Sequence, residues 1–447
     1  MSPISTSARA AGAASPTPCE LGRRVDPART PFAAALRQLP PGTDRDLARK
    51  LLAGLWESDP LADDVVLEFS QLPGGEGWRM LDRALLDGPQ ALADAPPSVR
   101  ALLGPILDPP DWLNCELLDA GCVAYSRVGV INAFAGARSL SYGYAIPRTA
   151  KILLATGRIE EMAGRRLVET GQWLLAATAP GNMRPDRCDR GIAACVRVRL
   201  VHAYVRRHML AQQDWDVPRD AIPLNATDIA ATLNIGFFAL HIQGVEQLGI
   251  SYSPGEKEAM AHMWRWVAHV VGVSPELQPL SYEHAIAFHA LYGLFDQRTA
   301  SVSAKSLTSA LLRHGLPQVA FGIPASRAND LARLTVPFTS ALLAYMLGPE
   351  DARLAGLSRN PLTLPMRAAP LAGRAYSLLR ACGLLGDDAL IAAAGLALTK
   401  RLLANAGSAH APLHPEAALS GSPAESHGSQ TASPRGAHPE RSVRAST

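Results

Sequence analysis

The sequence predicts an all-α protein, and three observations support this fold class. Alanine, leucine and arginine dominate the central part of the chain, and all three favour helices. Proline and glycine stand mainly at the ends of segments, where helices begin and end. No stretch alternates apolar and polar residues for long, as a half-buried strand would. Because no period of about 30 to 50 residues recurs, we expect a single large helical bundle rather than a helical repeat array.

Composition divides the chain of 447 residues into three parts. Residues 1–30 are rich in Ala, Ser, Thr and Pro, and residues 406–447 are rich in Ser, Gly, Pro, His and Ala. Neither segment shows a periodic apolar pattern, so we expect both to be disordered. Residues 31–405 are expected to fold as one domain with a large core.

The predicted helices follow one another closely along this domain. They span roughly residues 43–57, 61–71, 77–86, 98–106, 112–135, 148–156, 159–178, 189–212, 226–248, 254–272, 281–298, 302–313, 327–347, 368–384 and 386–404. Asn225, Ser253 and Ser281 are expected N-caps, because a short polar side chain can accept a hydrogen bond from the first turn. Gly249 and Gly272 are expected to end their helices, since glycine adopts the left-handed conformation that a C-cap needs.

Charge and cysteine usage exclude several classes of function. The 43 basic and 40 acidic residues nearly balance, and no basic block alternates with aromatic residues, so we expect no nucleic-acid partner. The six cysteines include no Cys-x-x-Cys pair, which favours packing over zinc binding and a reducing compartment.

No targeting or membrane segment is expected either. No run reaches the roughly eighteen apolar residues that a membrane span needs. A twin arginine, Arg23-Arg24, is followed by polar residues where an export signal would have an apolar region. We therefore expect a cytoplasmic protein without a membrane span.

The segment around His202 carries the most informative pattern. Arg199 stands three residues before His202 and Arg206 four residues after it, so the three side chains share one stripe of a helix. The rest of the segment is apolar, which indicates that this stripe faces the interior. An imidazole with two guanidinium groups suits a metal or an anionic cofactor, because a buried cationic cluster without an anion is costly.

A second pattern lies on the preceding predicted helix. Arg166 and Thr170 are four residues apart and could present a cation and a hydroxyl to one ligand. Spacing alone favours a simpler interpretation, a surface arginine with a threonine that only fills space. The loop over residues 179–186 is short, so we expect the two helices to be neighbours and the two patterns to meet.

Together these residues resemble the haem-dependent rubber oxygenases, also called latex clearing proteins, and the wider MpaB-type oxygenases. The matching elements, in chain order, are Thr156-Gly157-Arg158, Arg166-x-x-x-Thr170-Gly171-x-Trp173, Arg199-x-x-His202-x-x-x-Arg206, Leu248-Gly249-Ile250, His262-Met263-Trp264-Arg265 with Gly272-Val273, and Tyr345-Met346-Leu347-Gly348 followed by Leu357. They cover about residues 115–357. The Arg-x-x-His-x-x-x-Arg element alone is a weak signal, whereas the ordered series is specific.

The resemblance implies an all-α domain that binds haem b, with His202 as the axial ligand of the iron. It implies that Arg166 and Thr170 lie on the oxygen-binding side, where they could donate hydrogen bonds to bound dioxygen or an oxo group. It also implies that Arg199 and Arg206 support the site, facing the haem propionates or holding the fold. Both roles agree with the residue chemistry, since imidazole is a common haem ligand and propionates are anions that arginines neutralise.

Two departures from the family pattern concern catalysis. Rubber oxygenases can place a lysine beside the threonine as a closable distal ligand, whereas this chain has Glu169, so that gating is not expected. They also use a carboxylate upstream of the arginine motif, yet no acidic residue lies between Asp119 and Glu160. Either Glu169 is the catalytic base or the chemistry differs.

The sequence therefore predicts a cytoplasmic haem b-dependent oxygenase. We expect it to act with O2 on a small hydrophobic substrate, such as an isoprenoid or a polyketide-like compound, by oxidative C=C cleavage. One alternative is a non-haem metal oxygenase built on Glu258, His262, His284 and His289, although packing is the favoured role of these histidines. The other is a non-catalytic haem-binding or sensor protein on the same fold.

Overall fold

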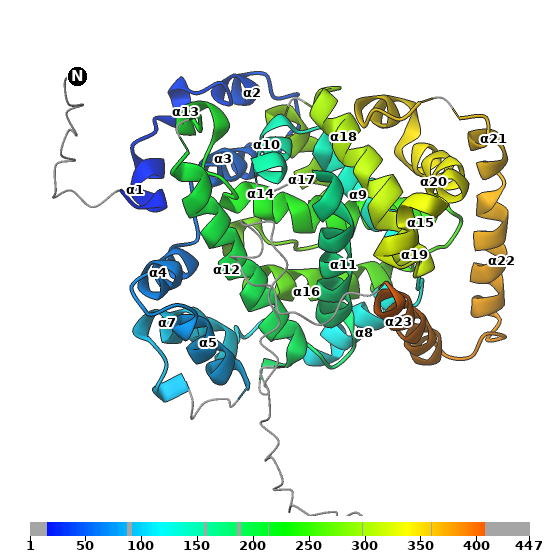
Figure 1. Cartoon of the computed structure of the whole chain (residues 1–447), viewed down its shortest axis with the longest axis horizontal. Helices are drawn as coiled ribbons and strands as arrows, with labels where there is room; N and C mark the ends of the chain where they lie inside the picture. The colour runs from blue at the N-terminus through cyan, green and yellow to red at the C-terminus, as the bar shows by residue number, and fades with distance from the viewer. Residues whose placement is uncertain are drawn as a thin grey trace, which may run out of the picture.

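The structure is a computed structural model that describes residues 16–86, 92–155, 159–185, 189–212, 214–296, 298–358 and 360–406, apart from the side chains of residues 159–163. All regular secondary structure in these ranges is helical (Figure 1), which confirms the all-α prediction. Most of the predicted disordered tail, from residue 407 on, and residues 1–15 lie outside the described residues.

The N-terminal helices form one side of the molecule, drawn in blue on the left of Figure 1. They are α1 (Pro18–Arg23), η1 (Pro27–Arg29), α2 (Ala33–Arg37), α3 (Arg45–Gly54), α4 (Pro60–Phe69), α5 (Glu76–Leu86) and α7 (Pro97–Leu107). The disorder predicted for residues 1–30 is wrong for α1 and η1. Thr17 and Glu20 form a capping box that starts α1, a local device that composition does not reveal.

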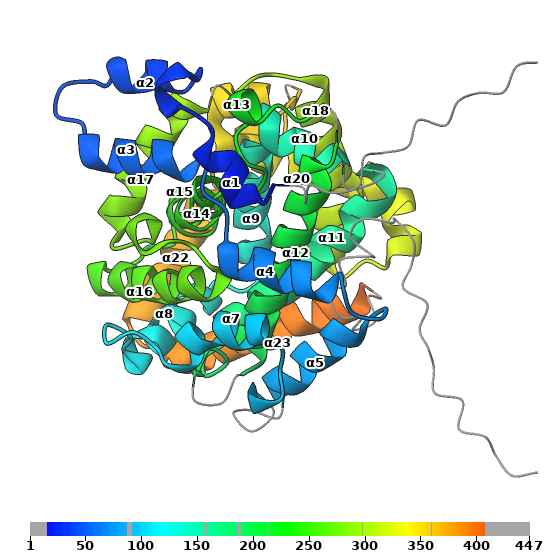
Figure 2. The same ribbon diagram turned by 90° about the vertical axis from the view of Figure 1, so that its left-hand side faces the viewer.

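The central helices carry the core. They are α8 (Cys115–Ser126), α9 (Ile131–Tyr144), α10 (Pro147–Ala155), α11 (Ile159–Thr178), α12 (Arg190–Leu210), α13 (Val217–Asp220), α14 (Ala226–Ala231), η3 (Thr232–Ala239), α15 (Leu240–Gln247), α16 (Pro254–Val271), η4 (Pro275–Leu277) and α17 (Tyr282–Phe295). The largest fully buried side chains come from α16, η3 and α17: Trp264, Trp266, Phe238 and Phe288. Helix α9 lies in the middle of the molecule in both views (Figures 1 and 2).

The C-terminal helices wrap the opposite side of this core. They are α18 (Val302–Ala310), η5 (Leu311–Gly315), α19 (Leu316–Phe321), α20 (Ala325–Leu354), α21 (Thr363–Met366), α22 (Ala369–Ala381) and α23 (Asp388–Asn405). In Figure 1, α21 and α22 form the right-hand edge. Helix α20 changes direction at Gly348, whose backbone is not helical (φ 78°, ψ 171°), and Pro349 starts the next segment.

Most predicted helix positions agree with the structure, and the predicted caps are confirmed. Asn225, Ser253 and Ser281 each accept a hydrogen bond from the backbone of the following helix. Gly272 is left-handed after α16, and Gly249 has a positive φ after α15. The single helix predicted over 112–135 is wrong, because Gly129 adopts a φ of +54° and the chain turns between α8 and α9.

One helix differs from the expectation about membranes. Among the described residues, α20 is long and apolar enough to cross a membrane by length and composition, with a hydropathy of 1.3. No apolar run long enough to span a membrane was expected from the sequence. Some core helices of water-soluble proteins pass the same test, but only 39% of the relevant window of α20 is buried.

Candidate active site

Helices α11 and α12 pack against each other, and α12 carries His202 in its second half. The imidazole is half-buried, and none of the described residues donates or accepts a hydrogen bond at its ring nitrogens. Burial, together with the nearby Arg206 cation, lowers the pKa of His202 to about 4. The imidazole is therefore neutral at pH 7, with a lone pair available to a metal.

The two arginines of the His202 stripe point to a different helix. Arg199 Nε donates to Asp59 Oδ2 at 2.6 Å and Nη2 donates to Asp59 Oδ1 at 2.9 Å. Arg206 forms an ion pair with Asp63, and its Nη2 donates to the Leu224 carbonyl at 2.9 Å. Asp59 caps α4, and Asp63 lies on α4, which packs across α12 (Figure 2).

The carboxylates of Asp59 and Asp63 supply the negative charge that the sequence pattern was expected to take from an anionic cofactor. Burial raises the pKa of Asp63, although the Arg206 cation opposes that shift. Gly272 makes room for the other pair, because a Cβ at this residue would lie 2.4 Å from both Arg199 Nε and Asp59 Oδ2. Arg199 and Arg206 therefore hold α12 on α4, and they need no external anion for neutralisation.

The second sequence pattern lies on α11. Arg166 and Thr170 share one stripe of this helix, and both side chains are half-buried. Thr170 Oγ1 donates to the Arg166 carbonyl at 2.8 Å, and Arg166 Nη1 donates to the Leu153 carbonyl at 3.3 Å. Burial lowers the pKa of Arg166, and the neighbouring Glu169 and Tyr144 act in the opposite direction. An arginine retains its charge despite such a shift.

Glu169 is held by a neighbour on its own helix. Its Oε1 accepts a hydrogen bond from Arg165 Nε at 2.7 Å, in an ion pair between residues four apart. To act as the catalytic base, Glu169 would first have to leave Arg165.

Helix α9 faces open space along one stripe. A Cβ at Gly136 or Gly143 would meet no heavy atom within 4 Å, apart from the glycine's own helix backbone. On the circumference of α9 these glycines and Leu140 lie between Ser139 and Tyr144, at about 100° of rotation per residue. Ser139 Oγ donates to the Gly236 carbonyl of η3 at 2.6 Å, and Tyr144 lies near Arg166 of α11.

The open stripe of α9 is therefore flanked by residues that contact η3 on one side and approach α11 on the other. Gly236 of η3 extends it, because a Cβ there would meet only Ser139 Cβ, at 3.8 Å. Aromatic residues lie deeper in the core near the same helices. Trp173 of α11 packs on Phe237 with ring centroids 5.4 Å apart, and Phe237 stacks on Trp264 at 5.6 Å. These rings exclude water from that part of the core.

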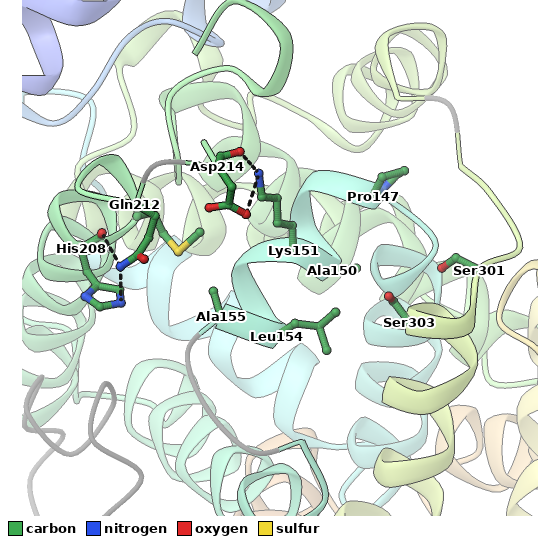
Figure 3. Close-up of a pocket in the computed structure, with 11 residues that line it drawn as sticks. Pro147, Ala150, Lys151, Leu154, Ala155, His208, Gln212, Asp214, Ser301 and Ser303 are labelled. Carbon is green, nitrogen blue, oxygen red and sulfur yellow. Dashed lines mark hydrogen bonds and ion pairs between the residues drawn. The ribbon is translucent and has the colours of Figure 1, made fainter. Parts of the chain in front are cut away.

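An open pocket of about 630 Å³ lies between α10 and the C-terminal end of α12 (Figure 3). Its apolar wall includes Leu154 and Met209, and its polar rim includes Lys151, His208 and Ser303. His202 does not line this pocket. Met209, however, lies two turns after His202 on almost the same stripe of α12.

Helix α10 is fixed beside this pocket by a buried ion network. Arg148 Nε donates to Asp228 Oδ2 at 2.8 Å, and Arg148 also pairs with Asp296. On the pocket side, Lys151 Nζ donates to the Asp214 carbonyl at 2.6 Å and to Asp220 Oδ2 at 3.1 Å. The role of these residues could not be predicted from the sequence, because their partners lie far away in the chain.

Three of the other described histidines, His241, His262 and His289, pack against neighbouring side chains or backbone, whereas Nδ1 of His284 is buried without a hydrogen-bond partner. No group of three or more His, Cys, Asp or Glu side chains within the described ranges could hold a metal ion. His262 Nε2 accepts from the Asn114 backbone at 3.0 Å, and His289 Nε2 lies 2.8 Å from Tyr142 Oη. His241 is buried and stacks on Tyr125 at 4.3 Å. The structure gives no support to a non-haem metal site on Glu258, His262, His284 and His289.

Comparisons with known proteins agree with the resemblance seen in the sequence. Residues 125–381, more than half of the chain, match the family described as "ER-bound oxygenase mpaB/B'/Rubber oxygenase, catalytic domain". The rubber oxygenase of Streptomyces sp. (strain K30) is 26% identical over 325 residues, which is 68% of this chain and 71% of that protein. A solved structure of latex clearing protein LCP in the closed state is similar in fold, with a TM-score of 0.60 and 21% identity, over 84% of this chain and 94% of that chain.

Proposed function

Because the chain belongs to the MpaB and rubber oxygenase catalytic-domain family, we propose that it is a haem b-dependent oxygenase acting with O2 on a small hydrophobic substrate. Family membership makes the chain an oxygenase, and the haem, the substrate class and the reaction are our proposal. The proposed reaction is oxidative cleavage of a C=C bond, in a substrate such as an isoprenoid or a polyketide-like compound.

The main support for the proposal is the environment of the His202 imidazole. Its imidazole is neutral, half-buried and without a hydrogen-bond partner among the described residues, on a helix packed against α11. We infer that it faces the open space beside Gly136, Gly143 and Gly236. In this proposal, the lack of side chains at these three glycines would leave room for a flat macrocycle.

In this proposal, His202 would hold the iron of the haem. A haem held there would supply the chemistry by which O2 is activated. Arg166 would present guanidinium N–H donors and positive charge on the same stripe of α11, whereas the Thr170 hydroxyl, which donates to the Arg166 carbonyl, would have to rotate before it could donate elsewhere. Trp173 and Phe237 keep water away from the deeper part of the site.

Arg199 and Arg206 have positioning roles. Their ion pairs with Asp59 and Asp63 lie about 40–60° around α12 from His202, so they fix the rotation of the helix. The pocket between α10 and α12 is the proposed entry for the substrate, because its apolar wall reaches Met209 on the His202 stripe. Its polar rim leaves room for a substrate with one polar end.

An absorption spectrum of the purified protein tests the haem. We expect a Soret band, and we expect His202→Ala to lose or shift it while Arg165→Ala, on the far side of α11, keeps it. A colourless protein that also fails to take up added haemin would refute the proposal. O2 consumption with a panel of lipophilic alkenes then tests catalysis, and haem binding without any O2 consumption would select the non-catalytic alternative.

The cytoplasmic location is a separate proposal that rests on the sequence alone. The segment after Arg23-Arg24 lacks the apolar region of an export signal. Fractionation of the source cells tests it, and recovery of the protein outside the cytoplasmic membrane would contradict it.

A further inference from the structure

Helix α22 packs on the molecule through its small and polar side. A Cβ at Gly373 would lie 1.9 Å from the Leu248 carbonyl oxygen, so only glycine allows this close approach. Tyr376 Oη donates to the Arg127 carbonyl at 3.1 Å, and Ser377 Oγ donates to the Gly249 carbonyl at 3.3 Å. The inner side of α22 is therefore anchored by backbone contact and hydrogen bonds rather than by an apolar stripe.

The outer side of the same helix is apolar. Leu371 and Leu378 are both 65% exposed, and Leu379 is 42% exposed. With Ala375 and Cys382, also exposed, they follow the spacing of one helical face. An amphipathic helix of a water-soluble domain usually buries such a face, so α22 has the opposite orientation.

Exposed apolar side chains continue from α22 onto α21 and α20. Asn360 Nδ2 donates to the Pro337 carbonyl at 2.7 Å and to Ser340 Oγ at 3.0 Å, which fixes the start of α21 beside α20. Figure 1 shows these helices together at one edge of the molecule. We call this surface the C-terminal apolar face and define it by six exposed residues: Leu334, Phe338, Leu362, Leu364, Leu371 and Leu378.

Positive charge accompanies this face. Arg367 after α21 and Arg374 on α22 are exposed, and neither has a carboxylate partner within the described part of the chain. Helices α21 and α22 contain no acidic residue, whereas on α20 the exposed Asp330 lies one turn before Leu334. Residues 360–406 contain Asp387 and Asp388, and Asp388 is bound to Arg380.

We propose that the C-terminal apolar face binds the surface of an anionic lipid membrane. Exposed leucines with unpaired arginines beside them are the pattern of a helix that lies in the membrane interface. Helix α22 has 13 residues, fewer than the roughly 20 needed to cross a membrane, so it would lie in the plane of the interface. The unpaired cations would contact lipid phosphates and carboxylates.

Two other occupants fit the surface less well. A symmetric dimer through α22 would bring like charges together, because Arg374 lies beside the apolar stripe and no exposed carboxylate on α22 faces it. The chain after residue 406 has only Leu413, Leu419 and Val443 as large apolar residues, too few to cover the face.

Co-sedimentation of the full chain with lipid vesicles tests this proposal without reference to haem or activity. We expect binding to vesicles of phosphatidylcholine with phosphatidylserine, weak binding to phosphatidylcholine alone, and release by high salt. The double variant Leu371→Glu, Leu378→Glu should lower the vesicle partition coefficient about tenfold or more. Leu280→Glu, at a leucine 59% exposed outside the face, is the matched control and should bind as the wild type.

A charge variant keeps the test independent of folding defects. Arg367→Gln with Arg374→Gln changes two exposed side chains and should weaken binding about fivefold for each charge. Unchanged binding of the double leucine variant, or equal binding to vesicles without phosphatidylserine, would overturn the proposal. Light scattering should show one mass at all protein concentrations without vesicles. A dimer that the leucine substitutions dissociate would overturn it in favour of a second copy.

Discussion

Gly136 offers a direct test of the open space inside the bundle. It lies in the interior of α9, and a Cβ there would meet no heavy atom within 4 Å. Glycine in a helix interior is less favourable than alanine by roughly 0.5–1 kcal/mol. We therefore predict that Gly136→Ala stabilises the haem-free protein by about that amount. For a folded region of nearly 400 residues this corresponds to a rise in Tm of roughly 1 °C, from an unfolding entropy of about 2 cal/mol/K per residue.

A large side chain at the same position should have a different effect. Gly136→Phe would place its ring in the space proposed for the haem, so we predict loss of the Soret band with the fold retained. Calorimetry of the haem-free protein and haemin titration followed by absorbance measure the two effects. Gly121→Ala is the control for crowding, because its Cβ would lie 2.2 Å from the Ala259 carbonyl oxygen and should destabilise the fold by about 1–3 kcal/mol. Normal haem uptake by Gly136→Phe would refute the assignment of this space.

Three further predictions follow from the ionisable groups and the pocket. The pKa of His202 is about 4 in the folded chain and 6.5 ordinarily, so the unfolded chain binds the proton first and stability falls as pH drops from about 6.5 to 4. In the haem-free protein, the free energy of unfolding of His202→Gln should fall by about 2 kcal/mol less than that of the wild type when the pH drops from 7 to 5, as measured by denaturant titration. An equal fall in both proteins would contradict the lowered pKa of His202. Arg206→Met should destabilise the fold by roughly 3–5 kcal/mol, because it leaves Asp63 buried and unpaired. The double variant Arg206→Met, Asp63→Leu should recover much of this stability. A double variant as unstable as Arg206→Met alone would contradict the ion pair. Leu154→Trp should raise KM for a lipophilic substrate without moving the Soret band, whereas an unchanged KM would exclude this pocket as the entry.

The fold could be predicted from local sequence because most of its signals are local. Apolar periodicity located the helices, and the caps at Asn225, Ser253 and Gly272 could be identified from single residues. The turn between α8 and α9 was missed, because Gly129 stands in a stretch that is otherwise compatible with one helix. A glycine can end a helix, or it can allow two helices to approach closely within one. Only its conformation and contacts in the structure distinguish these two roles.

The candidate site could be predicted only in part, for a related reason. His202, Arg166 and Thr170 come from motifs within single helices, so their spacing revealed them. The partners of Arg199 and Arg206 are 140 and 143 residues away, and no local pattern points to Asp59 or Asp63. The orientation of α22 could not be predicted from the sequence either, because a stripe of leucines normally indicates a buried face. Only the contacts of Gly373 and Tyr376 show that the other side of the helix packs on the molecule.

The Arg–Asp pairs also change the physical meaning of the Arg-x-x-His-x-x-x-Arg pattern. Arg199 and Arg206 lie one turn to either side of His202, and both are bound by the same helix, α4. Two attachments about 10 Å apart along α12 restrict its rotation much more than one would, because a single pair allows the helix to pivot. His202 lies outside this attachment, about 40–60° around the helix, and has no hydrogen-bond partner within the ranges that the structure describes. The arginines thus orient the imidazole by anchoring its helix, and their charge is already neutralised before any ligand enters.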